Sequence, residues 1–229
     1  MKNKLFVACI VTTIVAIFVI VLMLFGNNNT EHDPASASSD NQGLNITDAL
    51  RFKLDYESLN DEPQHTNLYV PENNRIVYLS FDELMNFIES GTGVFLFSRP
   101  ECPSCRALIP TLLQVAADAQ MNIHYYNITF DRDEHNENYV RILEALHSYL
   151  PVDTQNQSPE DEDFDESIKR VTVPHLFFVV DGQIISETMM NRHQLIEDED
   201  FDGIYEYLME KFLPVQQVLQ SRRSACQEC

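Results

Sequence analysis

Basic side chains are scarce in this sequence. Lysine and arginine together number 15 against 36 aspartate and glutamate residues, which gives the 229-residue chain a formal net charge of -21. A chain of this charge is repelled by the phosphate backbone, so we exclude a nucleic-acid-binding function. The acidic residues are concentrated at residues 160–166 and 197–202, and we interpret these two runs as solvated loops.

Cysteine is also scarce, since five residues are too few for a domain held together mainly by disulfides. Four of the five nevertheless form two C-x-x-C pairs, Cys102 with Cys105 and Cys226 with Cys229. The remaining Cys9 lies in an apolar run, where a free cysteine behaves as a small hydrophobic residue. The paired spacing is what directs the functional analysis, because it is typical of redox-active dithiols.

Charged residues are absent from residues 5–25, and this stretch is long enough as a helix to cross a bilayer. Lys2 and Lys4 precede it, whereas acidic residues follow it. The positive-inside rule then places residues 1–4 in the cytoplasm and the chain after residue 26 outside it. We expect a single-pass membrane protein whose main domain is extracytoplasmic.

The apolar run is longer than that of a cleavable signal peptide, and the small residues at 35–37 lie too far beyond it. We therefore predict a retained anchor, with cleavage as the alternative. Residues 26–43 are small and polar and predict a flexible tether. Residues 44–74 carry scattered apolar positions after a helix cap at Thr47, and we predict an N-terminal extension that packs on the domain.

Residues 75–213 show the periodicities of one α/β domain. We expect strands at 76–79, 94–97, 123–126, 176–180 and 183–186, the last two joined by an Asp-Gly turn. We expect helices at 81–88, from 103 to about 120, at 135–149 and at 201–212, the last ending before Pro214. An insertion at about 131–168 contains the first acidic run, and residues 214–229 form a C-terminal tail.

The first C-x-x-C pair follows a buried strand and opens a helix. A sulfur at a helix N-terminus faces unpaired N–H groups that favour the thiolate, so Cys102 is the predicted nucleophile. Cys105 lies one turn further and is placed to attack the mixed disulfide that Cys102 forms. Arg99 and Arg106 favour the thiolate, whereas Glu101 opposes it.

This arrangement resembles the thioredoxin superfamily over residues 75–213. The matching features are the strand before C-P-x-C, a helix with Pro110 eight positions after the first cysteine, and Val173-Pro174 leading into a hairpin. The resemblance implies a three-layer α/β fold, with a central mixed sheet flanked by helices. It also implies that Pro174 is a cis-proline facing the cysteines and that the backbone at Val173 binds the substrate chain.

Within the superfamily, SRPECPSCR followed by IPTLL resembles bacteriocin transport accessory proteins and related membrane-anchored thioredoxin-like proteins of Gram-positive bacteria. The upstream FKLDYESLN is similar to a segment that precedes the fold in such proteins. Two features differ from thioredoxin itself: Leu96 stands where thioredoxin has a buried acid, and the sequence has no tryptophan. The usual proton acceptor for the second cysteine is therefore missing.

The second pair, Cys226 and Cys229, has three interpretations. It is a second dithiol that exchanges electrons with Cys102 and Cys105 on a mobile tail, or a local disulfide formed in an oxidising compartment. The third is a four-cysteine zinc site that joins both pairs, which the separation of the pairs along the chain disfavours. We predict no metal site.

These features predict a thiol–disulfide oxidoreductase that acts on exported protein substrates through Cys102 and Cys105. It needs no organic cofactor, and its partners are protein thiols or disulfides and a membrane or extracytoplasmic protein that recycles the pair. The alternative is a redox-inactive module of the same fold that assists peptide export or folding.

Overall fold

The structure is a computed structural model that describes residues 47–190 and 200–227. The predicted membrane anchor at residues 5–25 and the tether at 26–43 lie outside these ranges, as does Cys229. Within the two described ranges, no helix combines the length and the apolar character needed to cross a membrane. The predictions for the N-terminal segment therefore remain predictions.

Helices and strands both occur along the whole of the described chain. In order they are α2 (Asp48–Glu57), β1 (Ile76–Tyr78), α3 (Phe81–Ser90), β2 (Gly93–Ser98), α4 (Pro103–Asp118), β3 (Ile123–Asn127), α5 (Thr129–Glu134), α6 (Glu137–Leu146), a 3-10 turn (His147–Tyr149), β4 (His175–Val180), β5 (Gln183–Met189) and α7 (Phe201–Gln227). The predicted α/β class is confirmed.

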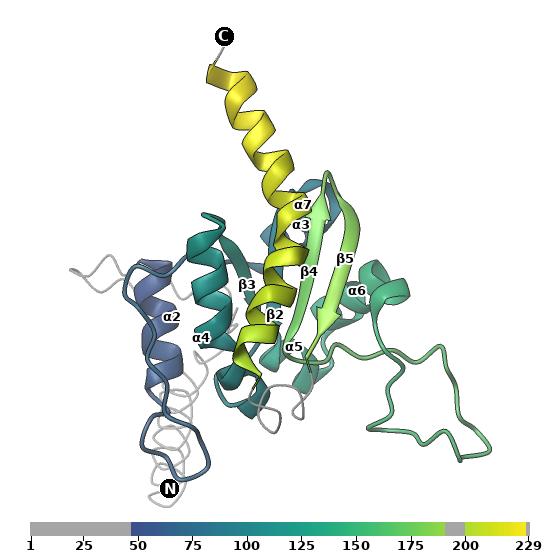
Figure 1. The fold of residues 1–229 in the computed structure, drawn as a ribbon. Helices are drawn as coiled ribbons and strands as arrows, with labels where there is room; N and C mark the ends of the chain where they lie inside the picture. The colour runs from purple at the N-terminus through teal and green to yellow at the C-terminus, as the bar shows by residue number, and fades with distance from the viewer. Residues whose placement is uncertain (1–46, 191–199, 228–229) are drawn as a thin grey trace, which may run out of the picture. The chain divides into compact units, whose positions relative to one another are not determined.

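The five strands form a mixed sheet in the order β1-β3-β2-β4-β5 (Figure 1). Strands β1, β3 and β2 are parallel, whereas β4 is antiparallel to β2 and β5 is antiparallel to β4. All six residues of the central strand β2 are buried, as expected for a strand covered on both faces. Its carboxyl end delivers the chain to the first C-x-x-C pair.

The side chains of β2 alternate between two hydrophobic cores. Val94 and Leu96 face a core that they share with α2, α4 and α7, whereas Phe95 and Phe97 face a core shared with α3 and α6. Figure 1 shows α4 and α7 side by side in front of the sheet. Helices therefore cover both faces of the sheet.

The short helix predicted in the N-terminal extension is α2, and the Thr47 side chain caps it by accepting a hydrogen bond from the Leu50 N–H. Phe52 and Tyr56 on this helix are fully buried in the same core as α4. Tyr56 also lies edge-on to Tyr125 of β3. The extension is thus an integral part of the domain core.

The helix predicted at residues 135–149 is α6 with its following 3-10 turn, but α5 was not predicted. His135 lies between the two helices in a left-handed conformation with φ 48°, which ends α5. The Asn136 side chain then caps α6 by accepting a hydrogen bond from the Tyr139 N–H at 3.0 Å. This reversal is set by local capping rather than by hydrophobic periodicity.

The prediction that the last helix ends before Pro214 is wrong, because α7 continues through this proline to Gln227. A proline inside a helix costs about 3 kcal/mol through its missing N–H and a steric clash. Phe212 and Val215 flank it and are fully buried against the core. Burial of these two side chains stabilises the helix by roughly 1.5–3 kcal/mol each, which offsets the cost.

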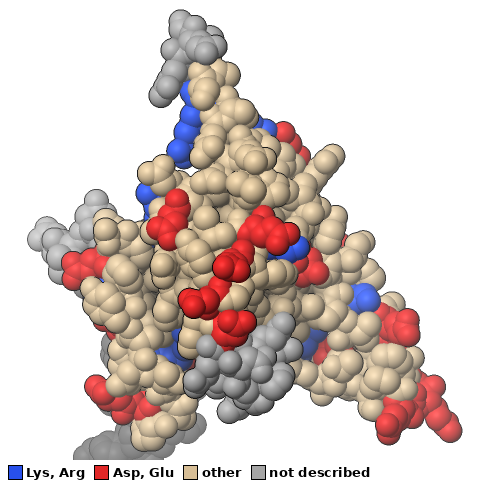
Figure 2. Space-filling view, viewed as in Figure 1, with Lys and Arg blue, Asp and Glu red and all other residues tan. Residues whose placement is uncertain are grey.

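Acidic side chains gather over α7 on the face shown in Figure 2. Asp202, Glu206 and Glu210 are exposed on this helix at a spacing of four residues, so they lie along one side of it. Arg222 and Arg223 are exposed further along, near the helix end. The negative net charge is thus carried by a solvated helix face as well as by the loop at 160–166.

Candidate active site

Cys102 lies at the junction between β2 and α4. It is the N-cap residue of α4, and Pro103 occupies the first helical position, where its missing N–H removes no helical hydrogen bond. The Cys102 sulfur accepts a hydrogen bond from the Cys105 backbone N–H at 3.3 Å. The prediction that the first sulfur caps the helix is confirmed.

The pKa of Cys102 is lowered to about 6. A hydrogen bond from the Cys105 side chain is the largest cause, and the backbone N–H groups of Cys105 and Ser104 and the charge of Arg99 act in the same direction. Burial opposes the shift. At neutral pH the Cys102 sulfur is therefore mainly the nucleophilic thiolate.

The two cysteines of the pair have opposite properties, and both are free thiols in this structure. Cys105 is fully buried, whereas Cys102 retains 8% of its exposure. Burial raises the pKa of Cys105, and the hydrogen bond to Cys102 and the charge of that residue raise it further. Only Cys102 is therefore ready to attack a substrate, while Cys105 stays protonated beneath it.

Strand pairing brings Val173 and Pro174 next to the cysteines. Because β4 is antiparallel to β2 and pairs Phe97 with His175, the segment that precedes β4 lies at the end of the sheet where Cys102 follows β2. The Val173–Pro174 peptide bond is cis, as predicted. The Cys102 sulfur lies 3.7 Å from the Val173 carbonyl oxygen, so the predicted substrate-binding backbone borders the nucleophile.

Hydroxyl groups occupy the space beneath Cys105. Leu96 is fully buried, and Ser98, two residues further along β2, points to the same face of the sheet. The Ser98 hydroxyl interacts with the Cys105 sulfur and lowers the pKa of that thiol, in opposition to burial. Tyr56 of α2 in turn hydrogen-bonds Ser98, with 2.6 Å between the two oxygens.

Tyr56 and Ser98 belong to the site, although no sequence motif includes them. In the sequence, Tyr56 is one apolar position of the extension, 42 residues before Ser98. The available signal was the alternation along β2, which places position 98 on the same face as Leu96. No local pattern predicts that a tyrosine of the extension reaches that position.

The two arginines near the pair have different roles. Arg99 lowers the pKa of Cys102 through its charge, as predicted. Arg106 is 1% exposed and donates hydrogen bonds to the Tyr56 and Thr66 carbonyl oxygens at 2.7 and 2.9 Å and to the Asn60 side chain at 2.8 Å. Arg106 therefore fastens the extension to the active-site helix, and this role was not predicted.

His175, which the sequence places beside Pro174, is fully buried. Its Nε2 atom pairs with the Glu187 carboxylate of β5 at 2.7 Å, and its ring packs against Phe177. Burial lowers the pKa of His175, while Glu187 opposes the shift. These contacts give His175 a structural role that joins β4 to β5.

Helix α7 ends away from the first C-x-x-C pair. Arg222 of α7 binds the Asp181 carboxylate at 2.7 Å and the Thr92 hydroxyl at 3.1 Å, and these residues lie at the end of β2 and β4 opposite to Cys102. Residue 226 lies one turn further along α7. Residues 214–227 therefore belong to a helix rather than to a separate tail. Cys229 lies outside the described residues, so the interpretations of the second pair stay predictions.

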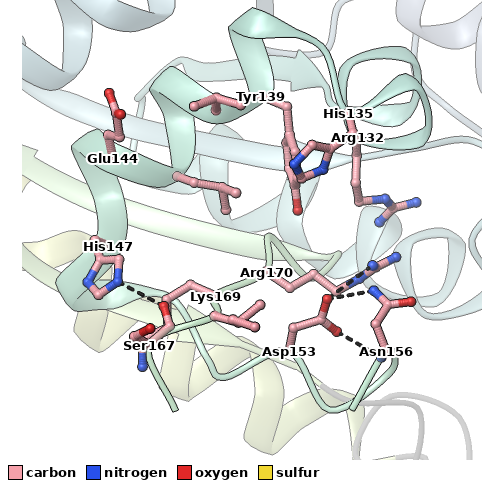
Figure 3. Close-up of a pocket in the computed structure, with 13 residues that line it drawn as sticks. Arg132, His135, Tyr139, Glu144, His147, Asp153, Asn156, Ser167, Lys169 and Arg170 are labelled. Carbon is pink, nitrogen blue, oxygen red and sulfur yellow. Dashed lines mark hydrogen bonds and ion pairs between the residues drawn. The ribbon is translucent and has the colours of Figure 1, made fainter. Parts of the chain in front are cut away.

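A pocket of about 320 Å³ lies between α6 and the insertion loop. In Figure 3, the Asp153 carboxylate bonds Asn156 and pairs with Arg170, while His147 bonds the Ser167 carbonyl oxygen at 3.0 Å. The first two contacts lie within the insertion loop, and the third joins this loop to the 3-10 turn that follows α6. We interpret these polar groups as structural, because each of them has a partner within the pocket.

Four predicted site residues converge: Cys102, Cys105, Val173 and Pro174. Over residues 47–190 and 200–227, no group of three or more histidine, cysteine or carboxylate side chains is placed to hold a metal ion. A scan against models of known protein families and a search of curated proteins found no match for this chain. The functional assignment therefore depends on the geometry of the site.

Proposed function

We propose that this protein is a thiol–disulfide oxidoreductase of the thioredoxin superfamily that acts on exported protein substrates. The observation that carries the proposal is the asymmetry of the dithiol. One sulfur caps a helix and has a pKa of about 6, and the other is buried with a raised pKa. Disulfide exchange requires these two properties, because one sulfur must attack the substrate as a thiolate and the other must remain available to resolve the mixed disulfide.

In the first step, the Cys102 thiolate attacks a substrate disulfide. A bond forms between the Cys102 sulfur and one substrate sulfur, the substrate S–S bond breaks, and the other substrate sulfur leaves as a thiolate. The Val173 carbonyl oxygen, 3.7 Å from the Cys102 sulfur, offers a backbone acceptor for an extended substrate chain. The product of this step is a mixed disulfide.

In the second step, Cys105 attacks the Cys102 sulfur of the mixed disulfide. The bond to the substrate breaks, the Cys102–Cys105 disulfide forms, and the proton of Cys105 ends on the departing substrate thiolate. The substrate has gained two electrons, and the pair has lost them. The reverse sequence introduces a disulfide, so the reduction potential of the pair decides the direction.

The setting of the protein is part of the proposal. The apolar, uncharged residues 5–25 support a single-pass anchor with the domain outside the cytoplasm, where exported proteins form disulfides. A membrane or extracytoplasmic protein then recycles the pair. The mixed sheet with helices on both faces and the cis-proline beside C-P-S-C support the superfamily assignment.

The direct test is catalysis of disulfide exchange by the full chain in mild detergent. We expect the reduced protein to accelerate the reduction of insulin by dithiothreitol, or the oxidised protein to accelerate the oxidation of reduced, unfolded ribonuclease. Cys102→Ser abolishes either activity, because no thiolate attacks the substrate. Cys105→Ser retains the first step and accumulates the mixed disulfide.

The control is Cys226→Ser, which changes a cysteine outside the proposed active site and leaves the rate unchanged. Acceleration in neither direction, together with no mixed disulfide in Cys105→Ser, contradicts the oxidoreductase function. The redox-inactive export or folding module then takes its place.

A further inference from the structure

Cys105 must lose a proton in a fully buried position in order to resolve the mixed disulfide. The titratable groups that face it are Cys102 on its own helix, Tyr56 of α2 and Tyr125 of β3. The groups that lower the pKa of Cys105 are the Ser98 hydroxyl and the Arg99 backbone N–H. Stabilisation of its thiolate therefore depends on neutral donors.

Ser98 and Tyr56 supply such donors. Both residues are 0% exposed, and the 2.6 Å separation of their oxygens is that of a strong hydroxyl hydrogen bond. The geometry allows either hydroxyl to donate in this bond. The Ser98 hydroxyl also lies close enough to the Cys105 thiol to lower the pKa of that thiol. The three groups thus form one chain from α2 through β2 to α4.

We infer that Tyr56 and Ser98 form a hydrogen-bond chain that stabilises the Cys105 thiolate during resolution of the mixed disulfide. Tyr56 donates its O–H to the Ser98 oxygen, and Ser98 donates its O–H to the Cys105 sulfur. Ser98 contacts the reacting sulfur, and Tyr56 is a positioning residue that acts through Ser98. This inference rests on the proposed oxidoreductase function.

The donors in this hydrogen-bond chain follow from the chemistry of Tyr56 at one end and Cys105 at the other. Burial raises the pKa of Tyr56 well above its usual value, so the phenol keeps its proton and remains a donor. A bond donated by Tyr56 polarises the Ser98 hydroxyl and strengthens its own donation. The chain thus needs no carboxylate at the position of Leu96, because it stabilises the thiolate rather than accepting its proton.

The proton is accounted for by the exchange itself. Cys105 releases its proton to water before its thiolate attacks Cys102, and the departing substrate thiolate takes up one proton from water, so the exchange as a whole neither gains nor loses a proton. Ser98 and Tyr56 keep their own protons throughout. They lower the free energy of the charged Cys105 sulfur while it is in the buried site.

The inference gives the N-terminal extension a role in the reaction. Arg106, the residue after Cys105, binds the Tyr56 backbone carbonyl at 2.7 Å and the Pro100 carbonyl at 3.3 Å. The same side chain therefore ties the Tyr56 backbone to the active-site turn. Helix α2 supplies the outer hydroxyl of the chain and is held in register by this contact.

The test is the reaction of the reduced full chain with Ellman's reagent, in a background of Cys9→Ala, Cys226→Ser and Cys229→Ser. The first released thionitrobenzoate reports attack by Cys102, and the second reports displacement by Cys105. Both phases are followed between about pH 6 and 11, which brackets the ordinary thiol range.

We expect Ser98→Ala to raise the pH midpoint of the second phase by about one unit, since a hydrogen bond to a charged group contributes roughly a factor of ten. At neutral pH its second phase slows about threefold, because a thiolate of higher pKa is more nucleophilic and offsets part of the loss. Tyr56→Phe, which acts through Ser98, raises the midpoint in the same direction by roughly half a unit. The first phase stays unchanged in both variants.

Tyr78→Phe is the matched control. It removes a phenol hydroxyl from the same aromatic cluster, but the Tyr78 hydroxyl donates to Asp55 rather than to Ser98. Its second phase keeps the pH midpoint of the parent. If Tyr56→Phe does not fold, Ser98→Ala carries the same test.

The outcomes separate the inference from the function on which it rests. The parent here is the protein with Cys9, Cys226 and Cys229 replaced. The hydrogen-bond chain alone is overturned if this parent shows two phases and the pH midpoint of the second phase is the same in Tyr56→Phe, Ser98→Ala and Tyr78→Phe. Release of only one equivalent by the parent overturns the proposed oxidoreductase function and the inference with it. A midpoint raised in Tyr56→Phe and Ser98→Ala but not in Tyr78→Phe supports the chain.

Discussion

The backbone N–H of Cys105 donates to the sulfur of Cys102 at 3.3 Å, so the resolving residue stabilises the nucleophile through its own main chain. The same residue adds a side-chain hydrogen bond, which is the largest cause of the lowered Cys102 pKa. One helical turn therefore creates both a reactive sulfur and a protected one.

The first prediction concerns the ionisation of Cys102. Alkylation of Cys102 by iodoacetamide should rise with pH with a midpoint of about 6. Arg99→Gln should raise this midpoint by roughly half a unit to one unit, because the arginine charge stabilises the thiolate. Arg223→Gln, an exposed arginine on α7, is the control and should leave the midpoint unchanged.

The second prediction concerns the stability of the reduced protein. A thiol whose pKa is lower in the folded chain binds fewer protons there, so the free energy of unfolding rises with pH. The contribution of Cys102 to the free energy of unfolding is fully present above about pH 8.5, which is roughly the pKa of a cysteine in the unfolded chain. This contribution is lost as the pH falls through about 6, the pKa of Cys102 in the folded chain. Cys105, with a raised pKa, gives the opposite slope above about pH 8.5.

Urea unfolding of the reduced protein at a series of pH values measures this slope. In the unsubstituted protein, the urea concentration at the midpoint of unfolding should decrease as the pH is lowered from about 8.5 to 6. The decline should be smaller in Cys102→Ser, which lacks the ionising sulfur but keeps every other group. Identical slopes in the two proteins would show that Cys102 does not ionise in this range.

The third prediction concerns Arg106. Arg106→Met removes a buried guanidinium and leaves the carbonyl oxygens of Tyr56 and Thr66 without their donor. We expect a loss of roughly 2–5 kcal/mol in the free energy of unfolding, because each buried acceptor that is left without a donor costs about 1–3 kcal/mol. Arg223→Met, at an exposed position, should change it by less than about 0.5 kcal/mol.

The fourth prediction concerns the second C-x-x-C pair. Arg222 anchors α7 at Asp181, the end of the sheet opposite to Cys102, and residue 226 lies beyond this contact. Replacing Cys226 and Cys229 together by serine should therefore leave the reduction potential of the first pair within about 10 mV. A larger change would show that the second pair is energetically coupled to the first.

Much of the fold was predictable because its signals are local. The capping box of α3 is present with both hydrogen bonds, from Ser80 to Glu83 and back. The continuous apolar run at 94–97 lies in the buried strand β2, and the Asp-Gly turn joins β4 to β5. Each of these features is decided within a few residues along the chain.

The rest depends on contacts between distant segments. Helix α7 passes Pro214 because Phe212 and Val215 are buried against a core that local rules do not include. Tyr56 reaches Ser98 only after α2 has packed on the sheet. The cysteine pair could be found from its spacing, whereas the hydroxyl groups beneath it depend on tertiary packing.

The reduction potential of the first pair tests the central claim most directly. The full chain with Cys9, Cys226 and Cys229 replaced is equilibrated in graded thiol–disulfide buffers, and the free thiols of Cys102 and Cys105 are quantified by alkylation. We predict a single cooperative two-electron transition, near about -270 mV for a reductase or near about -120 mV for an oxidase. Two independent one-thiol reactions with the buffer, without an internal disulfide, would contradict the oxidoreductase function.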